Sequence, residues 1–208
     1  MKQNKKATSI VEVLVVLVIV TLWVLSSFKL FWSWQKLSLN IQNKIQAIEI
    51  AREWIEVVTN IRNTNWFLYS SDYESCWNTL NYNEDCIWDN HSHSNYYINS
   101  ASYIVYSNWI KWFLEKKSIS WDYRDSNYRN TYRIYKTWSW FYTQTWVLNT
   151  TKFEFKPIFT REIQISYPWW TNFSGSQMLI KSKVFWSDSS STKPHKVVLQ
   201  TILTPYKK

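Results

Sequence analysis

The N-terminal third of the chain begins with an apolar run. From Thr8 to Phe28 the residues are apolar almost without a break, and Glu12 is the only charged residue among them. A run of this length can cross a lipid bilayer as a helix. Three lysines stand within the first six residues, and basic residues beside a span are retained in the cytoplasm. We therefore expect a basic N-terminal segment (1–7), a transmembrane segment (8–28) and an exported remainder.

Beyond Lys29 the pattern becomes amphipathic. Apolar residues recur at steps of three, four and seven positions, with polar residues between them: Leu37, Ile41, Ile45, Ile48, Ile55 and Val58. This is the period of one face of an α-helix. No proline interrupts it, so the pattern predicts a single helix from about Thr8 to about Asn60. Residues 29–62 should lay one apolar stripe on a globular domain.

The C-terminal part, from Tyr96 onward, has the pattern of strands and turns. Short runs rich in Tyr, Ile, Val, Phe and Thr are broken by Ser, Asn and Asp. The predicted strands are residues 97–106, 131–136, 153–159, 162–167, 178–186 and 196–203. The last two flank a polar segment, 187–194, that suits a hairpin loop. These elements predict an α+β fold, in which an antiparallel sheet within residues 63–208 packs on the C-terminal half of the long helix.

The composition adds one anomaly. The 208 residues suffice for one globular unit, and the net charge of +9 comes from dispersed residues, as is usual for solubility. The chain has one glycine beside sixteen tryptophans, although turns need small residues with freedom of φ. Trp169 and Trp170, for example, follow Pro168 where a turn would have glycines. Our hypothesis, which we call the recoding hypothesis, is that many of these tryptophans are encoded by UGA codons, which the source organism reads as glycine. The alternative is a genuinely tryptophan-rich, sugar-binding or aggregation-prone surface.

The start of the apolar run carries a family resemblance. Residues 6–14, KATSIVEVL, resemble the prepilin processing motif of type IV pilins and pseudopilins, with Ala7 where glycine is usual and Thr8 where phenylalanine or methionine is usual. The resemblance implies that residues 1–7 are a leader and that a prepilin peptidase cuts between Ala7 and Thr8 and methylates the new amine. Glu12 would then be the fifth mature residue and would pair with the N-terminal amine of a neighbouring subunit. An uncleaved signal anchor is the alternative.

A second stretch agrees with this resemblance. Residues 51–63, AREWIEVVTNIRN, resemble a segment common in pilin-like proteins, in which the position of Trp54 is typically glycine. The comparison therefore agrees with the recoding hypothesis at Trp54. By the same comparison Trp66 and Trp186 look like authentic tryptophans.

The two cysteines lie on the predicted exported side, where disulfides persist. We expect Cys76 and Cys86 to form a disulfide that closes a loop of about ten residues and contributes roughly 2 to 3 kcal/mol. A metal site that adds His91 and His93 is the alternative, but the spacing matches no compact zinc motif. We therefore expect no metal and no cofactor.

No catalytic constellation stands out in the sequence, which has no Gly-rich phosphate loop, nucleophile elbow or HExxH motif. A membrane-anchored enzyme is therefore not favoured. The expected function is a structural one, a minor pilin or pseudopilin of a type IV pilus or type II secretion-like filament. Expected partners are other pilin subunits, the prepilin peptidase, an inner-membrane assembly platform and membrane lipid. The expected location is the inner (cytoplasmic) membrane, and the filament after assembly.

A binding function is the alternative, namely a membrane-anchored exported protein such as a DNA-binding pilin of an uptake system. Aromatic and basic residues alternate in one segment: Tyr123, Arg124, Tyr128, Arg129, Tyr132 and Arg133. Such residues can stack on the bases and contact the phosphates of single-stranded DNA. The same alternation is equally expected of an exposed strand face.

Overall fold

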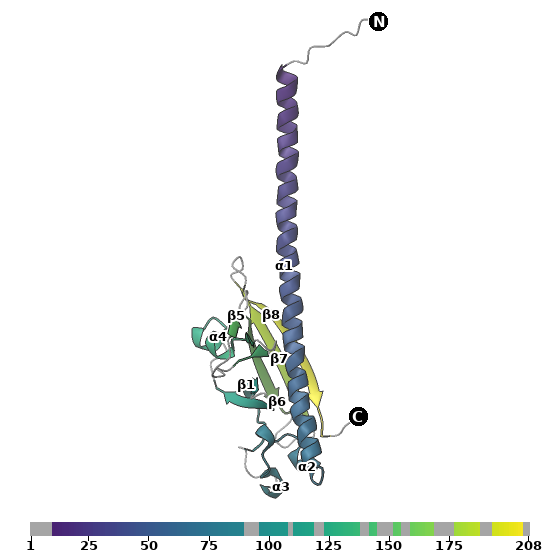
Figure 1. Ribbon diagram of the computed structural model, residues 1–208, viewed down its shortest axis with the longest axis vertical. Helices are drawn as coiled ribbons and strands as arrows, with labels where there is room; N and C mark the ends of the chain where they lie inside the picture. The colour runs from purple at the N-terminus through teal and green to yellow at the C-terminus, as the bar shows by residue number, and fades with distance from the viewer. Residues whose placement is uncertain are drawn as a thin grey trace, which may run out of the picture. The chain divides into compact units, whose positions relative to one another are not determined.

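The computed structural model describes residues 10–89, 96–107, 110–118, 123–137, 142–144, 152–154, 159–168, 177–187 and 193–205. The chain divides into two compact units, Met1–Lys44 and Ile45–Lys208. The helix α1 (Ile10–Leu68) contributes its N-terminal part to the first unit and its C-terminal part to the second (Figure 1).

The long helix forms because nothing in its sequence interrupts it. Its 59 residues include neither proline nor glycine, the two residues that most strongly oppose a helix interior. It ends at Leu68 rather than near Asn60. Asn65 explains the extra turns, because its buried side-chain amide donates to the carbonyl oxygens of Trp77 (3.4 Å) and Thr79 (2.9 Å). Tertiary contacts therefore hold the last turns in place.

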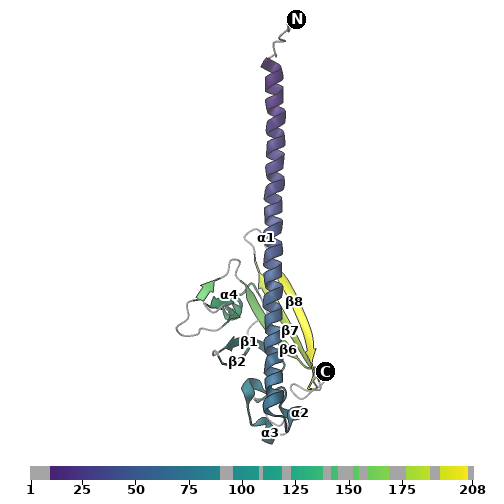
Figure 2. The ribbon, with the colours of Figure 1, turned by 45° about the vertical axis from the view of Figure 1, so that its right-hand side comes forward.

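In the second unit, α1 packs on a five-stranded antiparallel sheet (Figures 1 and 2). In spatial order the strands are β2 (Trp112–Lys117), β1 (Ala101–Ser107), β6 (Thr160–Ser166), β7 (Met178–Trp186) and β8 (His195–Leu203). All neighbouring pairs are antiparallel. The predicted α+β fold, a long N-terminal helix packed on an antiparallel sheet, is confirmed.

Smaller elements surround this frame. A three-stranded sheet has the order β4 (Tyr142–Thr143), β3 (Tyr135–Thr137) and β5 (Lys152–Glu154). The short helices are α2 (Tyr73–Cys76), η1 (Leu80–Tyr82), α3 (Cys86–Asp89) and α4 (Ser126–Tyr132).

The core lies between α1 and the sheet. Alternate residues of β7 are buried: Met178, Ile180, Ser182, Val184 and Trp186. A period of two places them on one face of the strand. The buried residues of α1 follow the helical period: Ala47, Ile50, Ala51, Trp54, Val57, Val58 and Ile61. Together with the sheet they form two apolar clusters, one that contains Trp54 and another that contains Ala51.

The strand predictions succeed best at the C-terminal hairpin. The predicted strand 178–186 coincides with β7, and the predicted strand 196–203 lacks only the first residue of β8. The predicted strand 131–136 is wrong in its first part, because Thr131 and Tyr132 belong to α4. This helix forms because the Asp125 side chain accepts from the backbone N–H of Asn127 at its N-cap. Its buried Tyr128 and Tyr132 then lie one turn apart on one face.

Two observed strands were not predicted. Neither β2 nor β4 shows a clear alternation of apolar and polar residues. In the predicted strand 97–106, residues 101–106 belong to β1, whereas Tyr97 lies outside β1 and forms an isolated bridge with Thr79.

Candidate functional site

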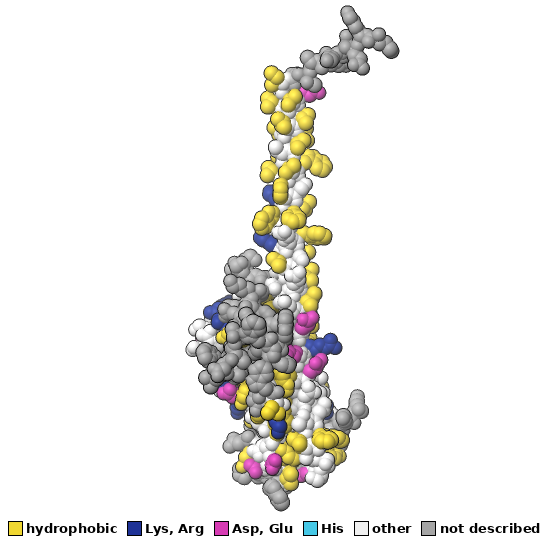
Figure 3. Space-filling model, viewed as in Figure 1, with side chains coloured by type: hydrophobic (Ala, Val, Ile, Leu, Met, Phe, Trp, Pro, Cys, Tyr) yellow, Lys and Arg dark blue, Asp and Glu magenta, His cyan; other side chains and the backbone are white. Residues whose placement is uncertain are grey.

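The N-terminal part of α1 presents an apolar surface. By length and composition α1 could cross a membrane, and it lies near the N-terminus. Its apolar side chains are exposed from Ile10 to Phe31, and Figure 3 shows many of them along the face in view. Such a surface needs lipid or other apolar helices around it.

Glu12 lies in the first turn of this helix. It is the only acidic residue of the described N-terminal unit. The predicted processing residues Ala7 and Thr8 lie outside the part of the chain that the structure describes. Their role therefore stays a prediction.

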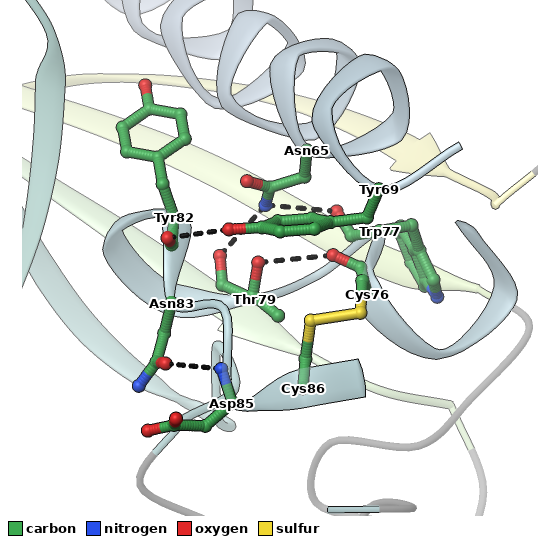
Figure 4. Close-up of a disulfide and its surroundings, with 9 residues drawn as sticks. All are labelled: Asn65, Tyr69, Cys76, Trp77, Thr79, Tyr82, Asn83, Asp85 and Cys86. Carbon is green, nitrogen blue, oxygen red and sulfur yellow. Dashed lines mark hydrogen bonds between the residues drawn. A yellow bond between two sulfur atoms is a disulfide. The ribbon is translucent and has the colours of Figure 1, made fainter. Parts of the chain in front are cut away.

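The structure joins Cys76 and Cys86 in a disulfide, with Cα atoms 5.4 Å apart (Figure 4). Both residues are fully buried and form a small cluster with Tyr69 and Tyr97. The hydroxyl of Thr79 donates to the carbonyl oxygen of Cys76 at 3.1 Å. The predicted disulfide is thus present, and it closes residues 76–86, which we call the disulfide loop.

The metal alternative finds no support within the described residues. They contain no group of three or more His, Cys, Asp and Glu side chains that could hold a metal ion. His91 and His93 lie outside the described ranges. Both cysteines are already used by the disulfide.

A buried carboxylate lies on the face of the sheet opposite α1. Glu162 is 2% exposed, and its carboxylate accepts from Ser102 Oγ (2.5 Å) and Tyr128 Oη (2.9 Å). Lys183 Nζ lies 3.5 Å from the same carboxylate. Burial and the Glu162 charge raise the pKa of Tyr128 well above its ordinary value. This network fastens α4 to β1, β6 and β7.

The α1 side of β6 carries the opposite charge. Arg161 is fully buried, and its guanidinium Cζ lies 3.3 Å from the centroid of the Trp54 ring. None of its three side-chain nitrogens has a hydrogen-bond partner, and neither has Glu53 Oε2 on α1. Burial raises the pKa of Glu53 from 4.5 to about 7, although the Arg161 charge opposes this rise.

Gln144 bridges a gap in the five-stranded sheet. It is 5% exposed. Its Oε1 accepts from the Val105 N–H at 3.3 Å, and its Nε2 donates to the carbonyl oxygens of Tyr132 (3.0 Å) and Arg161 (2.5 Å). The ladder between β1 and β6 ends at the pair Tyr103 and Ile163. One side chain therefore satisfies backbone groups where the two strands diverge.

The polar residues of these networks were not singled out from the sequence. Arg161 and Glu162 stand side by side in a run that is otherwise typical of a buried strand. Charged residues inside such a run are rarely buried without partners. That adjacency was the available signal for a buried polar network. Gln144 gave no comparable signal.

The Tyr and Arg series does not form one exposed face. Tyr128 and Tyr132 are 2% and 0% exposed, and both pack in a cluster with Ile104. Their rings are therefore not available for stacking on bases. The exposed members of the series are Arg124 and Arg129, so a nucleic-acid interface here would rest mainly on charge.

Comparisons of the chain with protein-family models, with curated proteins and with solved structures found no match.

Proposed function

We propose that this chain is a structural subunit, a minor pilin or pseudopilin, of a type IV pilus or type II secretion-like filament. In this proposal a prepilin peptidase cuts between Ala7 and Thr8, and α1 holds the mature chain in the inner membrane. An assembly platform then moves it into a filament with other subunits. The domain beyond the membrane forms the exposed surface of that filament.

The observation that carries the proposal is that the two parts of α1 differ in the exposure of their side chains. The N-terminal part of α1 exposes apolar side chains on all sides, whereas its C-terminal part buries one face in the core. The first part can therefore be held by lipid, or by other helices of its kind, without disturbing the fold of the second. A subunit that moves from a membrane into a filament needs this property.

Glu12 distinguishes an assembly helix from a simple anchor. A carboxylate in a hydrocarbon span costs several kcal/mol and implies a partner. The N-terminal amine of Thr8 in a neighbouring copy would be such a partner, as the family resemblance implies. The pairing would neutralise both charges inside a filament.

The disulfide supports export of the C-terminal unit. Disulfides persist in oxidising compartments and are rare in the cytoplasm. Cys76 and Cys86 are joined, and they lie beyond the apolar span in the sequence. This arrangement agrees with the orientation that the leader lysines predict.

The test replaces Glu12 with valine in the native host. We expect Glu12→Val to insert into the membrane as well as wild type, because a more apolar span partitions better. Its recovery in sheared filaments should fall by at least about tenfold, because the incoming amine loses its buried countercharge. Immunoblots of membrane and filament fractions measure both quantities.

Thr21→Val provides the matched control. It also makes the span more apolar, and among the described residues the Thr21 hydroxyl donates to the Val18 carbonyl of its own helix (2.8 Å). This variant should assemble like wild type. Equal recovery of Glu12→Val and wild type in the filament fraction would refute the assembly role of Glu12.

A further inference from the structure

The disulfide loop closes one edge of the large sheet. β2 is an outer strand, so part of its backbone faces away from β1. At Leu114 this outer side is occupied by Asn81. The Leu114 N–H donates to Asn81 Oδ1 at 3.0 Å, and Asn81 Nδ2 donates to the Leu114 carbonyl oxygen at 3.2 Å. This side chain makes the two bonds that a residue of an additional strand would make.

The described residues show no comparable cap along β8 at the other edge, where Arg62 Nη1 donates only beyond the strand, to the Thr204 carbonyl oxygen at 2.8 Å. β8 forms the opposite border of the sheet, and Val198 and Ile202 are 40% and 56% exposed. Between Val197 and Leu203, no side chain of the described residues hydrogen-bonds to the backbone. Native proteins commonly protect sheet edges against pairing with other chains. Within the part of the chain that the structure describes, a side-chain cap of this kind is found on β2 and not on β8.

The backbone is strained at Asn81 and at the next residue, Tyr82. Asn81 and Tyr82 have φ values of 55° and 60°, and they are the only non-glycine residues with positive φ in the described part of the chain. Asparagine tolerates this conformation, whereas a bulky residue such as tyrosine does not favour it. Consecutive residues of this kind persist only where surrounding contacts hold them.

Contacts at both ends hold the strained segment. The hydroxyl of Tyr69 donates to the Tyr82 carbonyl oxygen at 2.7 Å (Figure 4). The backbone N–H of Leu80 donates to the Tyr96 carbonyl oxygen at 2.7 Å. The disulfide then joins Cys76 and Cys86, which stand on either side of the segment. A crosslink of this kind limits how far the loop can open.

We propose that the disulfide loop is a redox-controlled cap on the β2 edge. While the disulfide is closed, Asn81 stays on the Leu114 backbone. A dithiol reductant transfers two electrons and two protons to the Cys76–Cys86 bond, which becomes two thiols, and is itself oxidised to a disulfide. The loop then relaxes from its strained conformation, Asn81 leaves, and the Leu114 backbone is exposed. The cap is therefore set only after the chain reaches an oxidising compartment.

Amide hydrogen exchange of the full-length chain in detergent micelles tests this proposal, with the probes at Leu114 and at Ile163 in β6. In the oxidised protein both amides should be protected. After treatment with dithiothreitol, the Leu114 amide should exchange faster by about tenfold or more, while the Ile163 amide keeps its rate, because opening is local. Unchanged protection of Leu114, or equal loss at both probes, would overturn the proposal.

A second variant separates the cap from general stability. Asn81→Gly removes the side chain and accepts positive φ without steric cost. With the disulfide closed, this variant should lose Leu114 protection by a similar factor and keep that of Ile163. Reduction should then increase the exchange rate of the Leu114 amide little further, because the cap is already absent. Retained protection of Leu114 in this variant would show that Asn81 does not hold the edge.

Asn83→Ala is the matched control in the same loop. The Asn83 side chain accepts from the Asp85 backbone N–H at 2.8 Å (Figure 4). This variant should leave the Leu114 exchange rate unchanged in the oxidised protein. An increase as large as that of Asn81→Gly would mean that any loosening of the loop exposes β2, which contradicts a specific role of Asn81. None of these outcomes depends on the proposed filament function.

Discussion

The guanidinium of Arg161 lies over the indole ring of Trp54, with its Cζ 3.3 Å from the ring centroid. Both side chains are fully buried, one on β6 and the other on α1. A buried cation is costly unless it is compensated, and contact with a desolvated aromatic face is worth about 2 kcal/mol. The helix is thus fastened to the sheet by a charged contact as well as by apolar packing.

This contact predicts a large loss of stability for Trp54→Ala in the chain as its sequence is written. The substitution leaves a cavity in the core and removes the aromatic face from Arg161. We expect the free energy of unfolding to fall by about 3 to 5 kcal/mol. Denaturant titration of the full-length chain in detergent micelles measures it. Phe67→Ala on the same helix is the control, because Phe67 is 78% exposed and its loss should cost no more than about 0.5 kcal/mol.

Residue 54 also tests the recoding hypothesis. If UGA is read as glycine in the source organism, protein from that organism should carry glycine at position 54 and at most of the other tryptophan positions. Trp66 and Trp186 should remain tryptophan. Tandem mass spectrometry of peptides from the native host, compared with the coding DNA, decides the matter. Tryptophan at position 54 in native protein, or UGG at most of these codons, would reject the hypothesis.

Glu53 predicts a pH dependence of stability. Burial raises its pKa from 4.5 to about 7, so the folded chain binds this proton more tightly than the unfolded chain does. Its contribution to stability is therefore complete below about pH 4.5 and is lost as the pH rises through about 7. We expect the free energy of unfolding to decline over this range and Glu53→Gln to remove the decline. Denaturant titrations at successive pH values measure both.

The control for this prediction is Glu56→Gln. Glu56 is exposed on the same helix, and it lies 3.6 Å from Arg52 in an ion pair. Exposed pairs of this kind contribute little to stability. The Glu56 charge is the last of the causes that shift the Glu53 pKa, after burial and Arg161, so the decline with pH should survive in this variant over a slightly narrower pH range. A decline that persists equally in Glu53→Gln would assign it to other groups.

Glu162 predicts a loss of stability through α4. Glu162→Ala removes the buried carboxylate that lies 3.5 Å from Lys183 Nζ and accepts from the hydroxyls of Ser102 and Tyr128. Removal of one member of a buried pair typically costs about 3 to 5 kcal/mol, and Glu162→Gln should cost less because it keeps hydrogen-bonding capacity. Thermal unfolding measures both variants. Glu115→Ala is the control, because its pair with Lys117 is partly exposed and should be worth no more than about 1 kcal/mol.

Processing gives the fifth prediction. We expect the mature chain to begin at Thr8 and to carry a methylated amine, because Ala7 and Glu12 stand in the register that the family resemblance requires. Mass spectrometry of the N-terminal peptide from filament or membrane fractions measures this. An intact leader, residues 1–7, in assembled protein would refute the filament proposal.

The sequence by itself determined the elements that depend on local pattern. The long helix follows from an uninterrupted helical period without proline or glycine. The hairpin of β7 and β8 follows from two runs rich in Ile, Val, Phe and Thr around a polar loop, and its nine pairs extend along both strands. The disulfide follows from the only two cysteines of the chain and their predicted side of the membrane. In each case neighbouring residues carry the information.

Tertiary structure alone decided the rest, because the deciding contacts are distant in the sequence. The helix continues to Leu68 since Asn65 reaches Thr79, and β2 is an edge strand whose cap, Asn81, comes from another segment. Arg161 and Glu162 are neighbours in the chain but lie on opposite faces of the sheet, one against α1 and the other against α4. Burial of a charged side chain depends on which distant groups surround it. A local pattern of residue types does not predict which groups those are.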